Sequence, residues 1–208
     1  MPLIRKPAGA DAATSSSAAD PFASLIKGDA GARRAAARSL ANLPGGIKAL
    51  GKAVAAEGDF SVREAIFTSL ARSGDLASVE AVLPHLRSDD ANLRTGALDA
   101  LRAMPDAVRP MLPALLADTD PDVRLLVCEI VRGLDPRDAT PMMIELLDRE
   151  TEVNVCASAV DVLAELGGSD AVPALRRCAG RFSGEQFLRF SIEAAIDQIG
   201  SQSGSPRG

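Results

Sequence analysis

Residues 120–134 read DPDVRLLVCEIVRGL, a sequence in which charged and apolar residues alternate with the period of a helix. Asp120 precedes a proline, and Arg124 follows four residues after the acid. Counted from Arg124, apolar residues stand at offsets −1, +3, +7 and +10, a spacing that places them on one face of an α-helix. The acid at offset −4 falls at the N-cap, where its carboxylate can accept the free backbone N–H groups of the first turn. The stretch therefore predicts an amphipathic helix with its own N-cap.

The same pattern occurs six times along the chain, at intervals of 30, 31, 30, 32 and 33 residues. A repeat of this length is typical of a solenoid, in which each unit buries its apolar face only against its neighbours. We call the residue at the place of Arg124 the anchor of its repeat. The anchors are Arg33, Arg63, Arg94, Arg124, Cys156 and Arg189, and the acids four residues before them are Asp29, Asp59, Asp90, Asp120, Glu152 and Glu185.

Each acid-bearing helix is preceded by a shorter apolar helix, so every repeat is expected to hold two helices. The expected second helices are Ala30–Asn42, Phe60–Arg72, Ala91–Ala103, Pro121–Leu134, Val153–Leu166 and Gln186–Ile199. The expected first helices are Pro21–Lys27, Gly46–Ala56, Leu76–Leu86, Ala107–Ala117, Ala139–Asp148 and Ala171–Ala179. Residues 21–200 thus form the predicted all-α solenoid, between expected disordered tails at 1–20 and 201–208.

The pattern D-x-x-[VL]-R-x-x-[AVI]-x-x-x-[LV]-x-x-[LM] resembles HEAT repeats, of the short kind also found in phycobilin lyases. This resemblance implies a right-handed α-α superhelix whose second helices line the concave side. It also implies that first helices bend at prolines, and Pro84 and Pro113 are placed to do so. Cys156 departs from the pattern and is expected to leave a gap in any row of arginines.

Composition excludes several classes of protein. Hydrophobic residues make up 47% of the chain, but aromatic residues only 3%, with no Trp or Tyr, and no apolar run reaches the length of a membrane span. Cys128, Cys156 and Cys178 lack metal-like spacing and are expected to be buried thiols, with a redox role as the alternative. His85 is the one histidine, and no nucleophile is placed beside it. We therefore expect no enzyme activity, metal or cofactor.

Charge is unevenly distributed. The net charge of −5 combines +5 over residues 1–52 with −10 over residues 53–208. This gradient either steers a complementary partner or reflects chance variation of a solvated surface. It disfavours a nucleic-acid groove along the whole array.

An arginine in the first turn of a helix opposes the helix dipole and therefore calls for a partner. A salt bridge to the acid of the same or an adjacent repeat would provide one, and stacked repeats would align such pairs as a ladder. The alternative, a ligand site, fits poorly with a pair that recurs in nearly every repeat. The expected structural ladder comprises Asp29, Arg33, Asp59, Arg63, Asp90, Arg94, Asp120, Arg124, Glu152, Glu185 and Arg189.

Binding positions are expected where the repeat leaves the residue free, mainly at +1, +5 and +8 from the anchor. These offsets point away from the apolar stripe, and their residues vary as a tailored surface or random drift would produce. The candidate partner-binding residues on the concave face are Arg34, Arg38, Glu64, Thr95, Asp99, Arg102, Leu125, Glu129, Arg132, Asp161 and Phe190.

The leading hypothesis is a non-catalytic adaptor or scaffold that binds a protein partner, cytoplasmic and serving a bacterial signalling or assembly system. We expect a monomer or weak dimer that contacts no membrane. One alternative is a tetrapyrrole lyase or chaperone, implied by the resemblance, for which Leu125, Phe190 and nearby arginines are the candidates. A second alternative, nucleic-acid repair, is disfavoured by the acidic charge.

Overall fold

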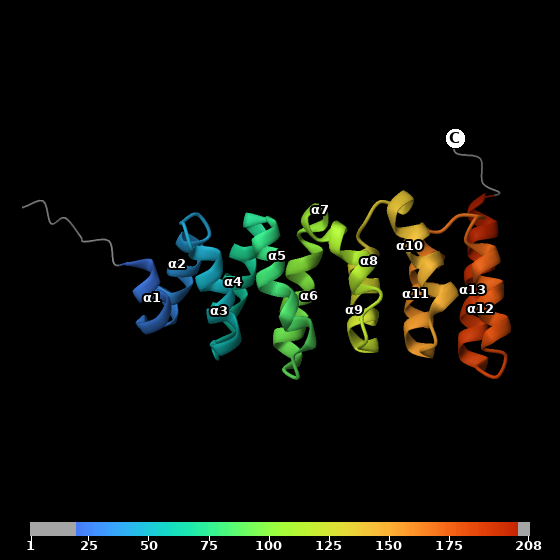
Figure 1. Ribbon diagram of the computed structural model, residues 1–208, viewed down its shortest axis with the longest axis horizontal. Coiled ribbons are helices and arrows are strands. Elements are labelled where there is room, and N and C mark those ends of the chain that lie inside the picture. The colour runs from blue at the N-terminus through green and yellow to red at the C-terminus, as the bar shows by residue number, and fades with distance from the viewer. Residues whose placement is uncertain (1–19, 204–208) are drawn as a thin grey trace, which may run out of the picture.

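A computed structural model describes residues 20–203, and every regular element within that range is helical. The elements follow one another along the long axis of the molecule in chain order, from α1 near one end to α13 at the other (Figure 1). Successive pairs of helices stand side by side across this axis. This arrangement confirms the predicted all-α solenoid of two-helix repeats.

The helices form two sets. The second helices are α2 (Ala30–Leu40), α4 (Phe60–Ser73), α6 (Ala91–Arg102), α9 (Pro121–Val131), α11 (Val153–Leu166) and α13 (Gln186–Ser203). The first helices are α1 (Pro21–Lys27), α3 (Gly46–Ala56), α5 (Leu76–Val82) with the 3-10 segment η1 (Leu83–Arg87), α7 (Pro105–Val108) with η2 (Arg109–Met111) and α8 (Leu112–Leu115), α10 (Pro136–Arg149) and α12 (Val172–Arg181). Each second helix packs on the second helix of the next repeat.

The core follows the predicted apolar stripe. In the four middle repeats every residue at offsets −1, +3 and +7 is buried, among them Ile66, Val127 and Leu163. The stripe weakens in the first repeat, where Leu43 at offset +10 is 39% exposed, because an end repeat has only one neighbour. Offsets +4 and +6 are also buried in several repeats, as at Phe67 and Ile130, because second helices pack on both adjacent second helices.

Prolines break two first helices that the sequence predicts as continuous. The expected Leu76–Leu86 helix changes to a 3-10 segment at Leu83, next to Pro84. The expected Ala107–Ala117 helix is divided into α7, η2 and α8, with Pro110 in η2 and Pro113 in α8. Proline lacks a backbone N–H and its ring crowds the preceding turn, so each break follows from the sequence. The bend expected from the HEAT resemblance is present.

Aspartates begin four of the second helices, as predicted. The side chains of Asp29, Asp59, Asp90 and Asp120 each accept a hydrogen bond from a backbone N–H in the first turn, with a shortest distance of 2.8 Å at Asp29. Glu152 occupies the N-cap of α11 but makes no such bond. Aspartate is among the preferred N-cap residues, which have short side chains that reach the N–H groups of the following turn.

Replacing Glu152 with aspartate is expected to stabilise the protein. A shorter side chain brings the carboxylate to the first turn of α11, and a gained N-cap bond is worth about 0.5 to 1 kcal/mol. Urea denaturation followed by circular dichroism measures the change. The reciprocal substitution Asp120→Glu removes an existing cap from α9 and should lower stability by a similar amount. Equal stability of both variants and the native protein would contradict this account of the N-caps.

The solenoid extends slightly beyond its predicted boundary. Helix α13 continues to Ser203, whereas the sequence analysis begins a disordered tail at residue 201. The hydroxyl of Ser201 donates to the carbonyl of Gln198 at 2.8 Å, a bond that fits a continuing helix. At the other end α1 begins at Pro21 as predicted, and the expected tail before it lies outside the described residues except for Asp20, the N-cap of α1.

Candidate functional site

The anchor arginines connect the two helices of their own repeats. Arg33, Arg63, Arg94, Arg124 and Arg189 each donate to a backbone carbonyl five or six residues earlier, at the end of the first helix or the turn after it. The distances are 2.9 Å from Arg33 to Gly28 and 2.8 Å from Arg124 to Asp118. Carbonyls at a helix end lack intrahelical partners and carry partial negative charge. This interaction explains the recurring arginine in the first turn of the second helix.

Three anchors also reach the next repeat. Arg33 contacts both carboxylate oxygens of Glu57 at 2.9 and 3.2 Å, and Arg124 contacts both oxygens of Glu150 at 2.7 and 2.8 Å. Arg63 contacts Asp90 at 2.8 Å. The predicted ladder is therefore present but incomplete.

The partners differ from the predicted ones. Glu57 and Glu150 end first helices and stand two residues before the N-cap acids that the sequence analysis proposed. Among the described residues, Asp90 is the one N-cap acid of the predicted set that pairs with an anchor. Its Oδ1 accepts backbone N–H groups of α6 and its Oδ2 accepts from Arg63, whereas Asp29, Asp59 and Asp120 bond backbone N–H groups without pairing with an anchor. Arg94 pairs with no carboxylate in the described part of the chain, Arg189 reaches Glu193 of its own helix at 3.9 Å, and Glu152 and Glu185 form no ion pair there.

Glu150 is the buried member of this ladder, with a side chain that is 3% exposed. Besides Arg124, it accepts the backbone N–H groups of Thr151 and Glu152 at 2.9 and 3.0 Å. Burial alone would raise its pKa, but the hydrogen bonds from Arg124 and these two N–H groups outweigh burial and hold the pKa below its ordinary value. Glu150 is therefore a charged, fully engaged structural group.

Cys156 leaves the predicted gap, and an arginine from the next repeat fills it. The Cys156 thiol lies 3.9 Å from the carbonyl of Glu150, where an arginine would bond in other repeats. Arg181, at the end of α12, reaches back to the carbonyls of Leu147 and Glu150. The end of α10 thus receives its cation from outside its own repeat. The three cysteines are buried and form no disulfide, as predicted.

We use the term second-helix face for the exposed side of the second helices, where the candidate binding residues lie. The structure does not unite those residues in one site. Arg34 donates to Ser61 of the next repeat at 2.9 Å, while Arg38 and Arg102 are exposed. Leu125 lines a separate hollow with Asp120 and Asp122, and Phe190 is 70% exposed on α13. Because α11 packs between α9 and α13, Leu125 and Phe190 are not adjacent.

Glu129, Arg132 and Asp161 belong to an ionic cluster across α9 and α11. Arg132 bonds Glu129 at 3.2 Å and also pairs with Glu165. Burial is the main cause that raises the pKa of Asp161; Arg132 opposes it, and Glu165 and Glu129 add to it. These residues therefore hold two repeats together, in addition to facing solvent.

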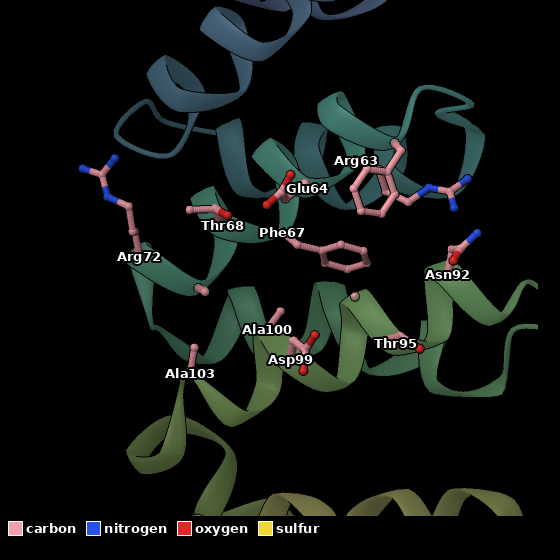
Figure 2. A pocket seen from close by; sticks show the side chains of 13 residues that line it. Arg63, Glu64, Phe67, Thr68, Arg72, Asn92, Thr95, Asp99, Ala100 and Ala103 are labelled. Atoms are coloured by element: carbon pink, nitrogen blue, oxygen red, sulfur yellow. The ribbon is translucent and has the colours of Figure 1, made fainter.

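The remaining candidates, Glu64, Thr95 and Asp99, do converge. They line a groove of about 620 Å³ between α4 and α6. Figure 2 shows Phe67 projecting into the space between the two helices, with Glu64 on one side and Asp99 on the other. We call this the α4–α6 groove. Its lining residues are Phe60, Arg63, Glu64, Phe67, Thr68, Ala71, Arg72, Asn92, Thr95, Gly96, Asp99, Ala100 and Ala103.

Gly96 creates the apolar floor of the groove. A Cβ atom at this position would lie 2.6 Å from Cε2 of Phe67, so glycine lets the ring lie directly on α6. The same ring meets His85 edge to face, with 6.4 Å between centroids. Burial lowers the pKa of His85, against a hydrogen bond with the Gly51 backbone that raises it. His85 is thus partly buried and packs against the ring that forms the floor.

The electrostatics of the groove are dominated by two free carboxylates. Glu64 and Asp99 are exposed, and neither forms an ion pair with another described residue. Arg63 is 13% exposed and already bound to Asp90 and the carbonyl of Glu57, so its charge is largely compensated. Arg72 is exposed at the opposite end of the groove from Arg63 (Figure 2). The middle of the groove is therefore acidic above an apolar floor.

Four further lining residues were not among the residues predicted from the sequence: Phe60, Phe67, Arg72 and Gly96. A comparison of repeats at offset +2 would have singled out Gly96, since the other repeats carry alanine, leucine or serine there. Offset +4 likewise carries its one aromatic residue at Phe67.

Other kinds of site find no support in residues 20–203. No group of three or more His, Cys, Asp or Glu side chains is placed to hold a metal ion there. Over the same described range, no helix is both long and apolar enough to cross a membrane.

Comparison with known proteins agrees with this architecture. Residues 108–196 match the family model for HEAT repeats, and none of the curated proteins compared matches the chain. A chain from a structure of microtubule plus end tracking by XMAP215, CLIP-170 and EB1 is similar with 15% identity and a TM-score of 0.56, over 87% of this chain and 90% of that chain.

Two further similarities are weaker. Human deoxyhypusine hydroxylase in complex with glycerol has 16% identity and a TM-score of 0.46, with 87% of this chain and 83% of that chain covered. The CpcE and CpcF complex of phycocyanin lyase from Nostoc sp. PCC7120 has 14% identity and a TM-score of 0.38, with 95% and 100% covered.

The matched segment spans the last three repeats, and the same helix pair, N-cap and anchor recur in the repeats before it. Residues 108–196 therefore form HEAT repeats, and the preceding helices continue the same two-helix solenoid.

Proposed function

We propose that this protein is a non-catalytic scaffold that binds a protein partner through its second-helix face. The observation that carries the proposal is the α4–α6 groove, an open apolar hollow whose carboxylates are free of partners within the described range. Surface residues engaged in the ladder or in the Arg132 cluster serve the stacking of repeats, whereas Glu64 and Asp99 in the groove form no ion pair within the described range. The exposed ring of Phe60 adds apolar surface at the edge of this hollow.

The packing of His85 and the burial of the three thiols support a non-catalytic role. The tetrapyrrole alternative lacks support, because its apolar candidates Leu125 and Phe190 lie on separate helices. Free carboxylates in the groove disfavour nucleic acid, since they repel phosphates. The cytoplasmic location and the role in a bacterial signalling or assembly system stay predictions.

Charge reversal on the second-helix face tests this function. Arg38→Glu with Arg102→Glu alters two exposed cations of α2 and α6, and partner capture is expected to fall at least fivefold. Affinity purification from the native cell, quantified by mass spectrometry, measures it. Lys48→Glu with Arg176→Glu makes the same charge change on exposed positions of first helices and should leave capture intact. Loss by both variants, or by neither, would contradict a partner on the second-helix face.

A further inference from the structure

The α4–α6 groove is chemically unlike the rest of the second-helix face. Its floor is formed by Phe67, Gly96 and Ala100, and its volume of about 620 Å³ falls in the range of pockets that hold a ligand. Phe60, at the edge, is 67% exposed, an aromatic residue of the kind that carries binding energy when a partner covers it. The groove therefore has room and apolar surface for large side chains.

The carboxylates in the groove indicate the charge of the residues that flank such a side chain in a ligand. Glu64 projects from α4 and Asp99 from α6, on either side of Phe67 (Figure 2). A cation held between them meets two carboxylates that have no competing ion pair among the described residues. Arg63 does not compensate them, because it is committed to Asp90 and the Glu57 carbonyl. An anionic ligand would instead be repelled from the middle of the groove.

Resting on the function proposed above, we propose that the α4–α6 groove binds a peptide segment of the partner protein in which a large apolar side chain is flanked by arginine or lysine. The apolar side chain packs on Phe67 in the space that Gly96 leaves open, and the basic side chains meet Glu64 and Asp99. Arginine suits this role because it packs its aliphatic part on an aromatic ring while its guanidinium bonds carboxylates.

The absence of Trp and Tyr from the chain permits a clean test, because a tryptophan in a peptide is then the sole such fluorophore. The probe is the peptide SRSWLSRS, and its counterpart SESWLSES replaces both arginines with glutamate. On titration with the full-length protein, tryptophan emission of SRSWLSRS is expected to shift to shorter wavelength and saturate. The glutamate peptide is expected to bind at least tenfold more weakly. Equal binding of the two peptides, or no binding of either, overturns the proposal.

Variants locate the site. Glu64→Lys with Asp99→Lys is expected to weaken SRSWLSRS at least tenfold and to strengthen SESWLSES. Both positions are exposed, so the variant keeps the native melting curve. Glu80→Lys with Asp197→Lys makes the same charge change at exposed positions on α5 and α13, outside the groove, and should weaken binding less than twofold. Equal weakening by the two variants would show a general charge effect and refute the groove as the site.

The outcome also separates this proposal from the broader one. If neither peptide binds while Arg38→Glu with Arg102→Glu still abolishes partner capture, the second-helix face is the binding surface and the groove is not its basic-peptide site. If the arginine peptide binds at Glu64 and Asp99 but partner capture is insensitive to every surface variant, the groove is confirmed as a peptide site and the proposed scaffold function is contradicted.

Discussion

Substituting methionine for Arg124 is expected to lower the free energy of unfolding by about 3 kcal/mol, a large effect for a single polar side chain. Glu150 is 3% exposed, and Arg124 supplies both of its charged hydrogen bonds. Methionine keeps the aliphatic part of the side chain but leaves a buried carboxylate with two backbone N–H partners alone. The loss therefore measures an unpaired buried charge and not the smaller net value of the intact pair.

The dependence on pH follows from the pKa of Glu150. In the native protein the folded-state pKa lies below the ordinary value of about 4.3, so this group's contribution is present above that value and disappears as the pH falls through the folded pKa. Without Arg124, burial dominates and raises the folded pKa above that value. As the pH falls, protonation of Glu150 removes the unpaired buried charge and so reduces the destabilisation of the variant. The stability gap between native protein and variant should therefore narrow from pH 7 to pH 4.

Urea denaturation at several pH values measures this gap, and two controls define its origin. Arg137→Met removes an arginine that is 92% exposed in its pair with Asp135 and should change stability by less than about 0.5 kcal/mol. Adding Glu150→Gln to Arg124→Met removes the stranded charge while keeping an acceptor for the two N–H groups, and should recover much of the loss. A gap that is constant with pH, or no recovery in the double variant, would contradict a buried charge as the cause.

The ladder illustrates how far the sequence specifies this molecule. The apolar offsets determine burial in the middle repeats because each repeat there meets the same two neighbours, so one pattern has one consequence. The partner of each arginine follows no such rule. Glu57 and Glu150 stand six residues before the anchors of their own repeats and bond the anchors of the preceding repeats, but Ser88 occupies this position in the third repeat. Arg63 precedes the repeat with Ser88 and bonds Asp90 instead, and Arg189, in the sixth repeat, reaches Glu193 of its own helix.

Only some of the residues that line the α4–α6 groove were predictable from the sequence. Glu64, Thr95 and Asp99 are recognisable because they occupy exposed offsets of adjacent repeats. The hollow itself depends on a single departure, since Gly96 lets the Phe67 ring approach α6 more closely than any side chain would permit. A periodic sequence pattern predicts the contacts that all repeats have in common, whereas this groove depends on residues that occur in only one pair of adjacent repeats.

Replacing Gly46 with alanine is expected to destabilise the protein by about 3 kcal/mol. Gly46 is buried at the start of α3, where an added Cβ would lie 1.7 Å from the carbonyl oxygen of Leu40 at the end of α2. Backbone cannot rotate aside as a side chain can, so α3 must shift away from α2. The cost resembles that of overpacking a core and exceeds the gain of alanine over glycine in a helix.

Two neighbouring glycines provide matched controls for this alanine. Gly45 has a φ of 78°, so Gly45→Ala should cost about 1 kcal/mol through backbone strain. Gly58 has open space around its Cβ position and no positive φ, and Gly58→Ala should be neutral or slightly stabilising. Urea denaturation should rank the variants Gly46, Gly45, Gly58 from the largest loss to the smallest. Equal stability of the Gly46 and Gly58 variants would refute the steric argument.

The Gly46→Ala variant is also expected to lose stability in only some of the repeats. Because repeats in a solenoid contact only their neighbours, displacing α3 should loosen α1 to α5 and leave distant repeats intact. Hydrogen exchange is expected to accelerate in residues 21–87 of the Gly46→Ala variant, with native protection retained in residues 153–199. Uniform acceleration along the chain would instead show that the array unfolds as one cooperative unit. The groove between α4 and α6 borders the affected part, so its peptide affinity should fall in this variant although no groove residue has changed.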